Sequence, residues 1–134
     1  MERTCILLKP DALKRRLAGR IISRIEDKGY IIADARMLQL DEAVLREHYS
    51  HLADQPFFPD IVRYMVSGPV LAMIVEGENV VEGTRKIIGA TRFEDAAAGT
   101  IRGDYAFSTR QNLIHGSDSA ESAEIEIRRF FARQ

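Results

Sequence analysis

The sequence predicts an α/β (α+β) protein of ferredoxin-like βαββαβ type, in which helices cover a four-stranded antiparallel sheet. Its hydrophobic patterns follow the order strand, helix, strand, helices, strand, helix, strand, helix. The length of 134 residues suits one core, so we expect a single domain over residues 1–134. The content of 46% apolar and 29% charged residues is typical of a globular protein.

The chain begins with a predicted strand and helix. Residues 3–9 form the strand, and Pro10 ends it, because the residue before a proline favours extended geometry. Alanine and isoleucine side chains in residues 18–25 then recur at i, i+3, i+4 and i+7. This spacing predicts a helix with one apolar face, which Gly29 closes.

A second strand is predicted at residues 31–40. Asp41 is a suitable N-cap for the short helix that follows and ends at Tyr49. Two prolines then bracket an aromatic pair ahead of a further helix around Ile61. Several short helices are therefore expected between the second and third strands.

The second half begins with a strand and a helix and then loses its periodicity. Residues 70–75 have the composition of a buried strand, and residues 80–88 predict a helix that Gly89 ends. Residues 90–111 show no clear period. A loop of this length is uncommon in a compact domain and is often functional.

The chain closes with a short strand and an amphipathic helix. We expect the strand at residues 112–115 and the helix at residues 120–131. Either Asp118 or Ser119 is the N-cap, and Asp118 and Glu121 have the spacing of a capping box.

Charge and cysteine content limit the possible classes of protein. The formal net charge is −1, so an anionic ligand requires a local cluster of basic groups, and a dedicated nucleic-acid binder is disfavoured. The single cysteine, Cys5, permits no intrachain disulfide, and its apolar neighbours favour a buried strand thiol over a reactive one. No apolar run approaches the roughly 20 residues of a membrane helix, nor has the N-terminus the apolar stretch of a signal peptide. We therefore expect a cytoplasmic protein without membrane contact.

The segment NLIHGSDS, residues 112–119, contains the most informative histidine. A histidine at the end of an apolar strand is often structural, and we expect His48 and His51 to be helix-surface groups. His115 differs because Gly116 allows close approach of another group. The following helix start also favours an anion. A neutral imidazole in this place can act as a nucleophile beside a phosphate.

Basic and hydroxyl side chains elsewhere could bind the phosphates. Lys9 ends the first strand, Arg85 lies on the helix before the long loop, and Thr91 and Arg102 lie within that loop. Each could alternatively be a solvated surface group. Arginine presents a planar fork to phosphate oxygens and lysine a compact charge. The chain lacks a Walker A pattern, so phosphate binding requires another scaffold.

These segments together resemble the nucleoside diphosphate kinases over essentially the whole chain. The resemblance rests on ERTCILLKPD, the His48-Tyr49 pair, PFFP, SGPV, GATR, GTIRGD and, most specifically, NLIHGSDS followed by SAE. It implies transfer of the γ-phosphate of a nucleoside triphosphate, typically ATP, to a nucleoside diphosphate. The implied reaction is ping-pong through a phosphohistidine at His115.

The resemblance also assigns roles to the other candidate residues. Lys9 and Tyr49 would flank the γ-phosphate, and Lys9 and Asn112 would contact the sugar hydroxyls. The outer phosphates would be held by Arg85, Thr91 and Arg102. Phe57 would stack on the base with Ile61 beside it, and stacking tolerates every base. Glu126 would orient the histidine ring, Ser117 would bond Glu126, and Asp118 matches the position that follows.

Cofactor and partners follow from the same resemblance. Mg²⁺ would arrive with the nucleotide phosphates, because the sequence shows no carboxylate cage for a resident metal. We expect a homo-oligomer built from dimers, with a homohexamer favoured over a homotetramer. Phe93 and Ala98 stand where prolines are common, so the long loop should be less constrained. Two alternatives stay open, a catalytically inactive nucleotide-binding module and a nucleic-acid-binding or regulatory protein.

Overall fold

The computed structural model describes residues 1–132, so the expected domain of residues 1–134 extends two residues beyond the described part. Four strands and seven α-helices alternate along these residues, together with two 3-10 turns. The elements are β1 (Glu2–Leu8), α1 (Pro10–Lys14), α2 (Ala18–Asp27), β2 (Ile31–Leu38), α3 (Glu42–His48), η1 (Ser50–Leu52), α4 (Phe58–Met65), β3 (Val70–Gly77), α5 (Val80–Ile88), η2 (Phe93–Asp95), α6 (Ile101–Tyr105), β4 (Ile114–Gly116) and α7 (Ala120–Phe131).

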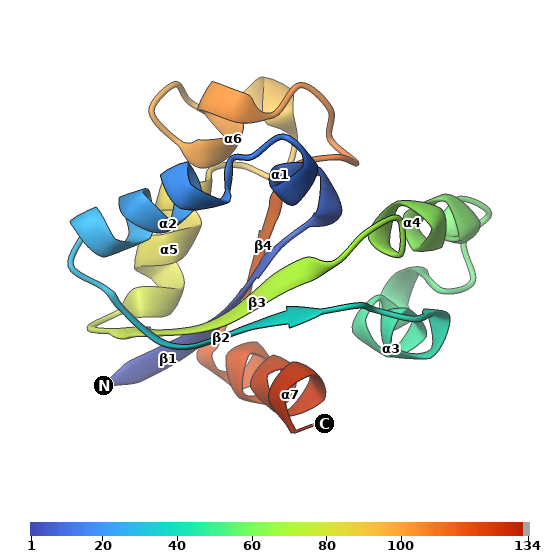
Figure 1. The fold of residues 1–134 in the computed structure, drawn as a ribbon, viewed down its shortest axis with the longest axis horizontal. Helices are drawn as coiled ribbons and strands as arrows, with labels where there is room; N and C mark the ends of the chain where they lie inside the picture. Colours follow the sequence, from blue (N-terminus) through green and yellow to red (C-terminus); the bar gives the residue numbers. More distant parts are fainter. Residues whose placement is uncertain (133–134) are drawn as a thin grey trace.

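The sheet has the predicted four strands, in the order β2-β3-β1-β4. All three neighbouring pairs are antiparallel. Helices α1, α2, α5 and α6 lie on one side of the sheet, and α7 covers the other side (Figure 1). The predicted ferredoxin-like fold is therefore confirmed.

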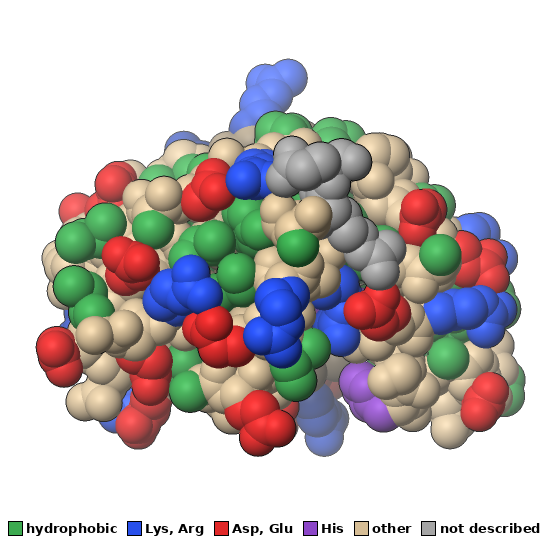
Figure 2. All heavy atoms as spheres, turned by 90° about the horizontal axis from the view of Figure 1, so that it is seen from below, with side chains coloured by type: hydrophobic (Ala, Val, Ile, Leu, Met, Phe, Trp, Pro, Cys, Tyr) green, Lys and Arg blue, Asp and Glu red, His purple; other side chains and the backbone are tan. Residues whose placement is uncertain are grey.

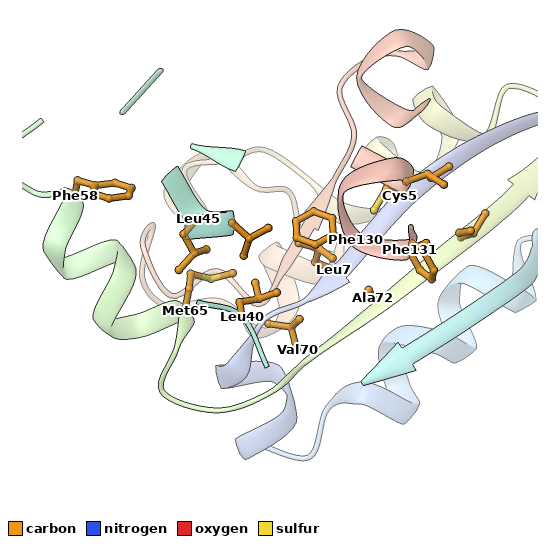
Figure 3. Close-up of a cluster of buried hydrophobic side chains, with 13 residues drawn as sticks. Cys5, Leu7, Leu40, Leu45, Phe58, Met65, Val70, Ala72, Phe130 and Phe131 are labelled. Carbon is orange, nitrogen blue, oxygen red and sulfur yellow. The ribbon is translucent and has the colours of Figure 1, made fainter. Parts of the chain in front are cut away.

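β1 is central and contributes to two separate cores. Cys5 and Leu7 face the core beneath α7, α3 and α4, whereas Ile6 and Leu8 face the core beneath α2 and α5. The alternation follows from the geometry of a strand, in which successive side chains point to opposite faces. Figure 3 shows the first of these cores, with Phe130 among its members. Cys5 is fully buried, as predicted.

The last strand begins later than predicted. β4 covers residues 114–116 instead of 112–115. Leu113 has a backbone φ of 76°, which a strand does not permit, so the extended ladder starts only at Ile114. His115 consequently lies in the middle of β4, opposite Leu7 of β1.

Two short helices were not predicted. α1 and α6 each have five residues, too few to show a helical period in the sequence. α6 lies within the segment that was predicted to be a loop, and the Thr100 side chain caps it by accepting a hydrogen bond from the Gly103 N–H at 2.9 Å. The long segment is thus partly ordered by local capping.

The N-caps of α3 and α7 can be compared with the residues that the sequence predicted for them. Asp41 caps α3, as predicted, and accepts a hydrogen bond from the Val44 N–H at 2.9 Å. Ser119 rather than Asp118 caps α7, through the Ser122 N–H at 3.0 Å. Of the two candidate N-caps, Ser119 is therefore the one used, and Asp118 and Glu121 have the spacing of a capping box without forming one. Within residues 1–132, no helix has both the length and the apolar character needed to cross a bilayer.

Candidate active site

A pocket of about 560 Å³ opens where β4, α3, α5 and α7 meet. It brings together most of the residues that the sequence singled out. These pocket residues are Lys9, Tyr49, Arg85, Thr91, Arg102, Asn112, His115, Asp118 and Glu126. Four of them lie on α5, α6, β4 and α7, and the others lie in the loops and at the helix ends between elements, so only folding places them side by side.

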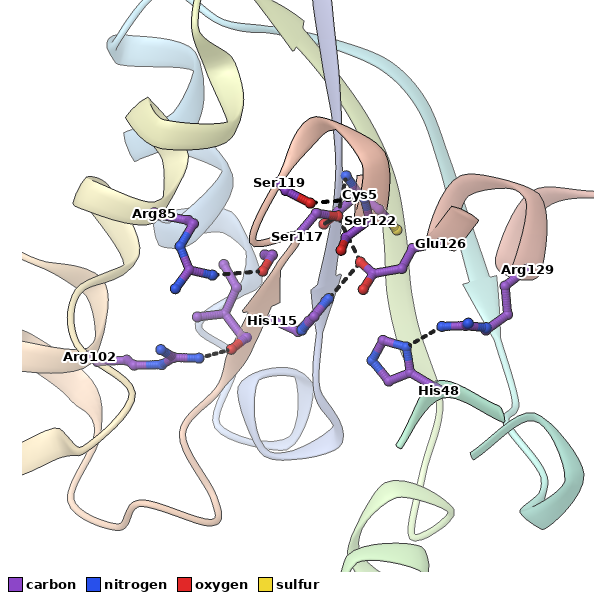
Figure 4. A network of polar contacts seen from close by, with 12 residues as sticks. Cys5, His48, Arg85, Arg102, His115, Ser117, Ser119, Ser122, Glu126 and Arg129 are labelled. Carbon is purple, nitrogen blue, oxygen red and sulfur yellow. Dashed lines mark hydrogen bonds and ion pairs between the residues drawn. The ribbon is translucent and has the colours of Figure 1, made fainter. Parts of the chain in front are cut away.

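His115 is held by a carboxylate of α7. Its Nε2 lies 2.8 Å from Glu126 Oε1, and the same oxygen accepts a hydrogen bond from Ser117 Oγ at 2.7 Å (Figure 4). Burial works against ionisation of Glu126, but the hydrogen bonds from His115 and Ser117 outweigh it and lower the pKa of the carboxyl. The ionised carboxylate only accepts, so His115 carries its proton on Nε2 and keeps the lone pair on Nδ1.

Ser117 is fixed from the other side by the central strand. It is fully buried, its Oγ accepts a hydrogen bond from the Cys5 N–H at 3.2 Å, and its own N–H donates to the Cys5 carbonyl at 3.2 Å. The strand pairing of β4 with β1 thus sets the position of the hydroxyl. The hydroxyl in turn sets the carboxylate that holds the histidine.

Three cationic side chains form the opposite wall of the pocket, and we call Lys9, Arg85 and Arg102 the cationic wall. Lys9 is 8% exposed, and its Nζ donates to Asn112 Oδ1 at 2.9 Å. Burial lowers the pKa of Lys9 to about 8, and the charge of Arg102 adds to this effect. Burial and the neighbouring Arg85 likewise lower the pKa of Arg102 to about 10. These cations destabilise one another in the free protein, which favours binding of an anion.

The arginines of the cationic wall are held by backbone carbonyls. Arg102 donates to the carbonyls of Asn112, Gly89 and Ile114 at 3.3, 3.2 and 2.5 Å. Arg85 donates to the Gly116 carbonyl at 3.4 Å. Carbonyl acceptors fix the guanidinium groups without neutralising their charge, so the positive potential of this wall is preserved.

Two of the expected nucleotide-binding residues lie apart from the pocket. Phe57 immediately precedes α4 and Ile61 lies on its second turn, and neither lines the pocket. The guanidinium of Arg110 stacks over the Phe57 ring at 5.2 Å. The face of this ring is therefore accessible to a planar group.

His48 was predicted to be a helix-surface group, and this prediction is wrong. Its ring packs edge-on against the ring of His115, with 4.7 Å between centroids. Its Nδ1 lies 2.9 Å from Nη1 of Arg129, a residue that the sequence analysis did not single out. Arg129 follows Glu126 by three residues, so helical spacing could have placed both on one face. His51 is exposed at the rim of the pocket, as predicted.

The pocket contains one cluster of side chains with possible metal-ligating atoms. His48, His115 and Glu126 are the only group of histidine, cysteine or acidic side chains within residues 1–132 whose candidate ligand atoms cluster, all within 4.8 Å. Nδ1 of His48 is engaged by a guanidinium and Nε2 of His115 by the carboxylate. A hard cation such as Mg²⁺ prefers oxygen ligands, and this group offers only the carboxylate of Glu126, with the guanidinium of Arg129 close to His48.

Comparison with known proteins identifies the family of this chain. The family model described as nucleoside diphosphate kinase matches residues 2–134. The nucleoside diphosphate kinase of Acetivibrio thermocellus is 52% identical, with 98% of this chain and 96% of that protein aligned. The Methanothermobacter thermautotrophicus enzyme is 53% identical over 98% of this chain and 87% of its own length.

Solved structures agree with the sequence comparison. The apo crystal structure of nucleoside diphosphate kinase from Encephalitozoon cuniculi superimposes with a TM-score of 0.95 at 51% identity, covering 98% of this chain and 89% of that one. The chain belongs to the nucleoside diphosphate kinase family, whose members transfer the γ-phosphate of a nucleoside triphosphate to a nucleoside diphosphate by a ping-pong mechanism through a phosphohistidine.

Proposed function

We propose that His115 is the phosphorylated histidine and that Nδ1 is its attacking atom. The observation that carries this proposal is the 2.8 Å contact of Nε2 with Glu126, which leaves the Nδ1 lone pair free. The lone pair forms the N–P bond while the bond from phosphorus to the β-phosphate oxygen breaks, and the nucleoside diphosphate leaves with that electron pair. The second nucleoside diphosphate reverses the step. Ser117 and Glu126 hold the ring throughout.

The cationic wall binds the phosphates in this proposal. Lys9 and Tyr49 flank the γ-phosphate, and Arg85, Thr91 and Arg102 hold the outer phosphates. Support comes from their common position around one pocket with His115. Charge-assisted hydrogen bonds from fixed donors stabilise the negative charge that spreads over the transferred phosphoryl group.

The nucleoside occupies the side of the pocket towards α4. Asn112 and Lys9 contact the sugar hydroxyls, and their side chains are already joined by a 2.9 Å hydrogen bond. Phe57 stacks on the base with Ile61 beside it. The guanidinium of Arg110 occupies the ring face of Phe57 here, as a planar base would. Every nucleobase has a flat face that can stack on a ring, so we propose that the protein accepts nucleotides with different bases.

Enzymes of this family use a divalent metal ion, and we propose Mg²⁺. Asp118 on the pocket wall would face the metal, while the cationic wall holds the phosphates that carry it. A hydrogen bond with Ser122, and the charge of Arg85, lower the pKa of Asp118, so its oxygens are ionised. This donor chemistry fits Mg²⁺, which is bound through a few carboxylates plus substrate phosphates. When bound, Mg²⁺ neutralises charge on the phosphate oxygens.

We also propose a homo-oligomer built from dimers, with a homohexamer favoured over a homotetramer. β2 is an edge strand of the sheet, and its alternate side chains Ile31 and Met37 are 55% and 58% exposed. An apolar edge strand is prone to pair with another chain. Light scattering of the eluted protein should give six times the 15.1 kDa of one chain.

For localisation we propose the cytoplasm, where a lone reduced cysteine is ordinary.

A nucleic-acid-binding role is less well supported. The net charge is −1, and Figure 2 shows acidic and basic side chains interspersed on the face of the molecule that it displays. Binding of a polyanion requires clustered basic groups, and its affinity falls steeply with salt. Titration with single-stranded DNA at rising salt tests this alternative, and binding that weakens with salt would support it.

Labelling with γ-labelled ATP and Mg²⁺ tests the proposed mechanism. We expect acid-labile, alkali-stable label on the protein that passes to GDP, and no label on His115→Ala. His51→Ala is the matched control, because His51 lies exposed at the rim of the same pocket. Label that persists in His115→Ala would show that another residue is the nucleophile. A folded wild type that binds nucleotide without labelling would support the inactive-module alternative.

A further inference from the structure

The guanidinium of Arg129 is buried and contacts His48, whose ring packs against that of His115. The side chain of Arg129 is 11% exposed and lies one helical turn after Glu126 on α7. Its Nη1 lies 2.9 Å from Nδ1 of His48, and its Nε lies 3.3 Å from Oε1 of Glu47. Two groups of α3 therefore hold this guanidinium, which is close enough to the reaction site to affect it.

The contact between Arg129 and His48 fixes the state of the imidazole. A guanidinium has five N–H donors, no acceptor, and stays protonated in proteins. It can only donate, so Nδ1 of His48 must present its lone pair. The neutral ring then carries its single hydrogen on Nε2. A second proton would have to sit on Nδ1, directly opposite the guanidinium.

The surroundings of His48 keep the ring uncharged. The ring packs edge-on against His115, Tyr49 and Phe130, with centroid distances of 4.7, 4.8 and 5.2 Å. Burial lowers the pKa of His48 to about 3, and the positive charges around it act in the same direction while Glu126 opposes them. The titratable groups that face it are Glu47 and Tyr49 at α3, Lys9 after β1, His115 on β4, and Glu126 and Arg129 on α7.

We propose that Arg129 is a positioning residue for phosphoryl transfer, because it holds His48 as the neutral Nε2–H ring and so reserves Glu126 for His115. Candidate ligand atoms of His48, His115 and Glu126 all lie within 4.8 Å of one another. A protonated His48 would be a cation whose Nε2–H competes more strongly for the carboxylate than the neutral ring does, and His115 would lose the acceptor that orients its Nδ1. Figure 4 shows His48 between Arg129 and the pair of His115 and Glu126. The inference rests on the proposed role of His115.

The pH dependence of kcat separates this role from a structural one. Arg129→Ala removes the guanidinium and lets water reach Nδ1 of His48, so two of the causes that lower the pKa of His48, its burial and the charge of Arg129, weaken together. His48 then titrates closer to the ordinary histidine pKa of about 6.5. When the pH is lowered from about 7 to about 5.5, we expect the loss of kcat in the variant to be about ten times larger than the loss of kcat in the wild type. Arg128→Ala is the matched control on the exposed side of α7 and should keep the wild-type profile.

Two further variants identify His48 as the mediator. In Arg129→Ala with His48→Gln, the side chain at position 48 cannot take up a proton, so the additional acidic loss should disappear. Arg129→Lys keeps a cationic donor and should retain most of the wild-type profile. An unchanged profile in Arg129→Ala, or an acidic loss that persists with His48→Gln, would overturn the proposal.

Nuclear magnetic resonance of the wild type provides a test that needs no variant. Long-range proton–nitrogen spectra of the imidazoles should show His48 with its hydrogen on Nε2 and no titration above about pH 5. Hydrogen on Nδ1, or a midpoint near the ordinary histidine value, would overturn the inference even if Arg129→Ala fails to fold. Failure of the labelling experiment at His115 would instead overturn the proposed function, so the two failures are distinguishable.

Discussion

Two walls of the pocket meet at His115, namely the cationic wall and the wall formed by α7, and they differ in whether their charges are compensated within the protein. The cationic wall of Lys9, Arg85 and Arg102 makes its hydrogen bonds to an amide and to backbone carbonyls. In the described part of the chain, none of the three forms an ion pair with a carboxylate. Its positive charge is therefore left for an incoming ligand.

The α7 wall instead compensates each charge within the protein. Glu126 accepts from His115 and Ser117, and Arg129 is held by His48 and Glu47. Such pairing fixes geometry and leaves little net charge. The comparison indicates that one wall supplies electrostatic stabilisation of the phosphoryl group, while the other supplies orientation of the nucleophile.

The largest expected effect is loss of charge from the cationic wall. Lys9→Met keeps the length of the side chain but removes the ammonium group that would face the γ-phosphate. Removing one fixed donor to a transition-state charge costs about 100- to 1000-fold, and we expect a loss of this size in kcat/KM. Steady-state kinetics with ATP and GDP measures it, with the exposed Lys14→Met as control. A loss below about tenfold would show that the wall does not work through charge.

A smaller loss is expected on the α7 wall. Glu126→Gln keeps the shape of the side chain but replaces its carboxylate by an amide. A hydrogen bond to a charged group contributes about 1.5–3 kcal/mol, so kcat should fall roughly 10- to 100-fold. KM should change little, because Glu126 orients the nucleophile and holds no phosphate. A rise in KM by the same factor as the fall in kcat would show that Glu126 also contributes to nucleotide binding, contrary to this expectation.

The cationic wall should also have its own pH dependence. The pKa of Lys9 is lowered to about 8, first by burial and then by Arg102, so this ammonium is charged below that pH and neutral above it. We expect kcat/KM to fall up to about tenfold per unit above about pH 8, since this ratio reports the free enzyme. Lys9→Arg stays charged and should remove this dependence. The same alkaline fall in Lys9→Arg would exclude Lys9 as its source.

The smallest expected effect is on the stability of the segment that carries Arg102 of the cationic wall. In Gly103→Ala the new Cβ would lie 1.9 Å from the backbone oxygen of Ala97, so α6 and with it Arg102 must shift. We expect a destabilisation of about 1–3 kcal/mol in thermal denaturation. Gly19→Ala is the matched control in α2, where the added Cβ would meet nothing within 4 Å beyond its chain neighbours and the backbone of its own helix, and it should stabilise by about 0.5–1 kcal/mol. Equal effects would argue against strain in α6.

Elements with a clear period or cap were predictable. The helix at residues 18–27 follows from its apolar spacing, and the N-cap of α3 follows from Asp41. The five-residue helices α1 and α6 lack a full helical repeat, so no period could announce them. The shift of β4 depends on the positive φ of Leu113, which an aliphatic side chain does not signal.

The sequence by itself determined the succession of strands and helices along the chain and the family resemblance, and it singled out His115 as a candidate, because these depend on local pattern and on the spacing within motifs. Only the tertiary structure decided that His48 lies inside the pocket, that Arg129 pins its Nδ1, and that Lys9 and Arg102 share one buried wall. Each of these contacts joins residues distant along the chain. Their charge states depend on burial and on neighbours, which exist only after the sheet and its helices have packed.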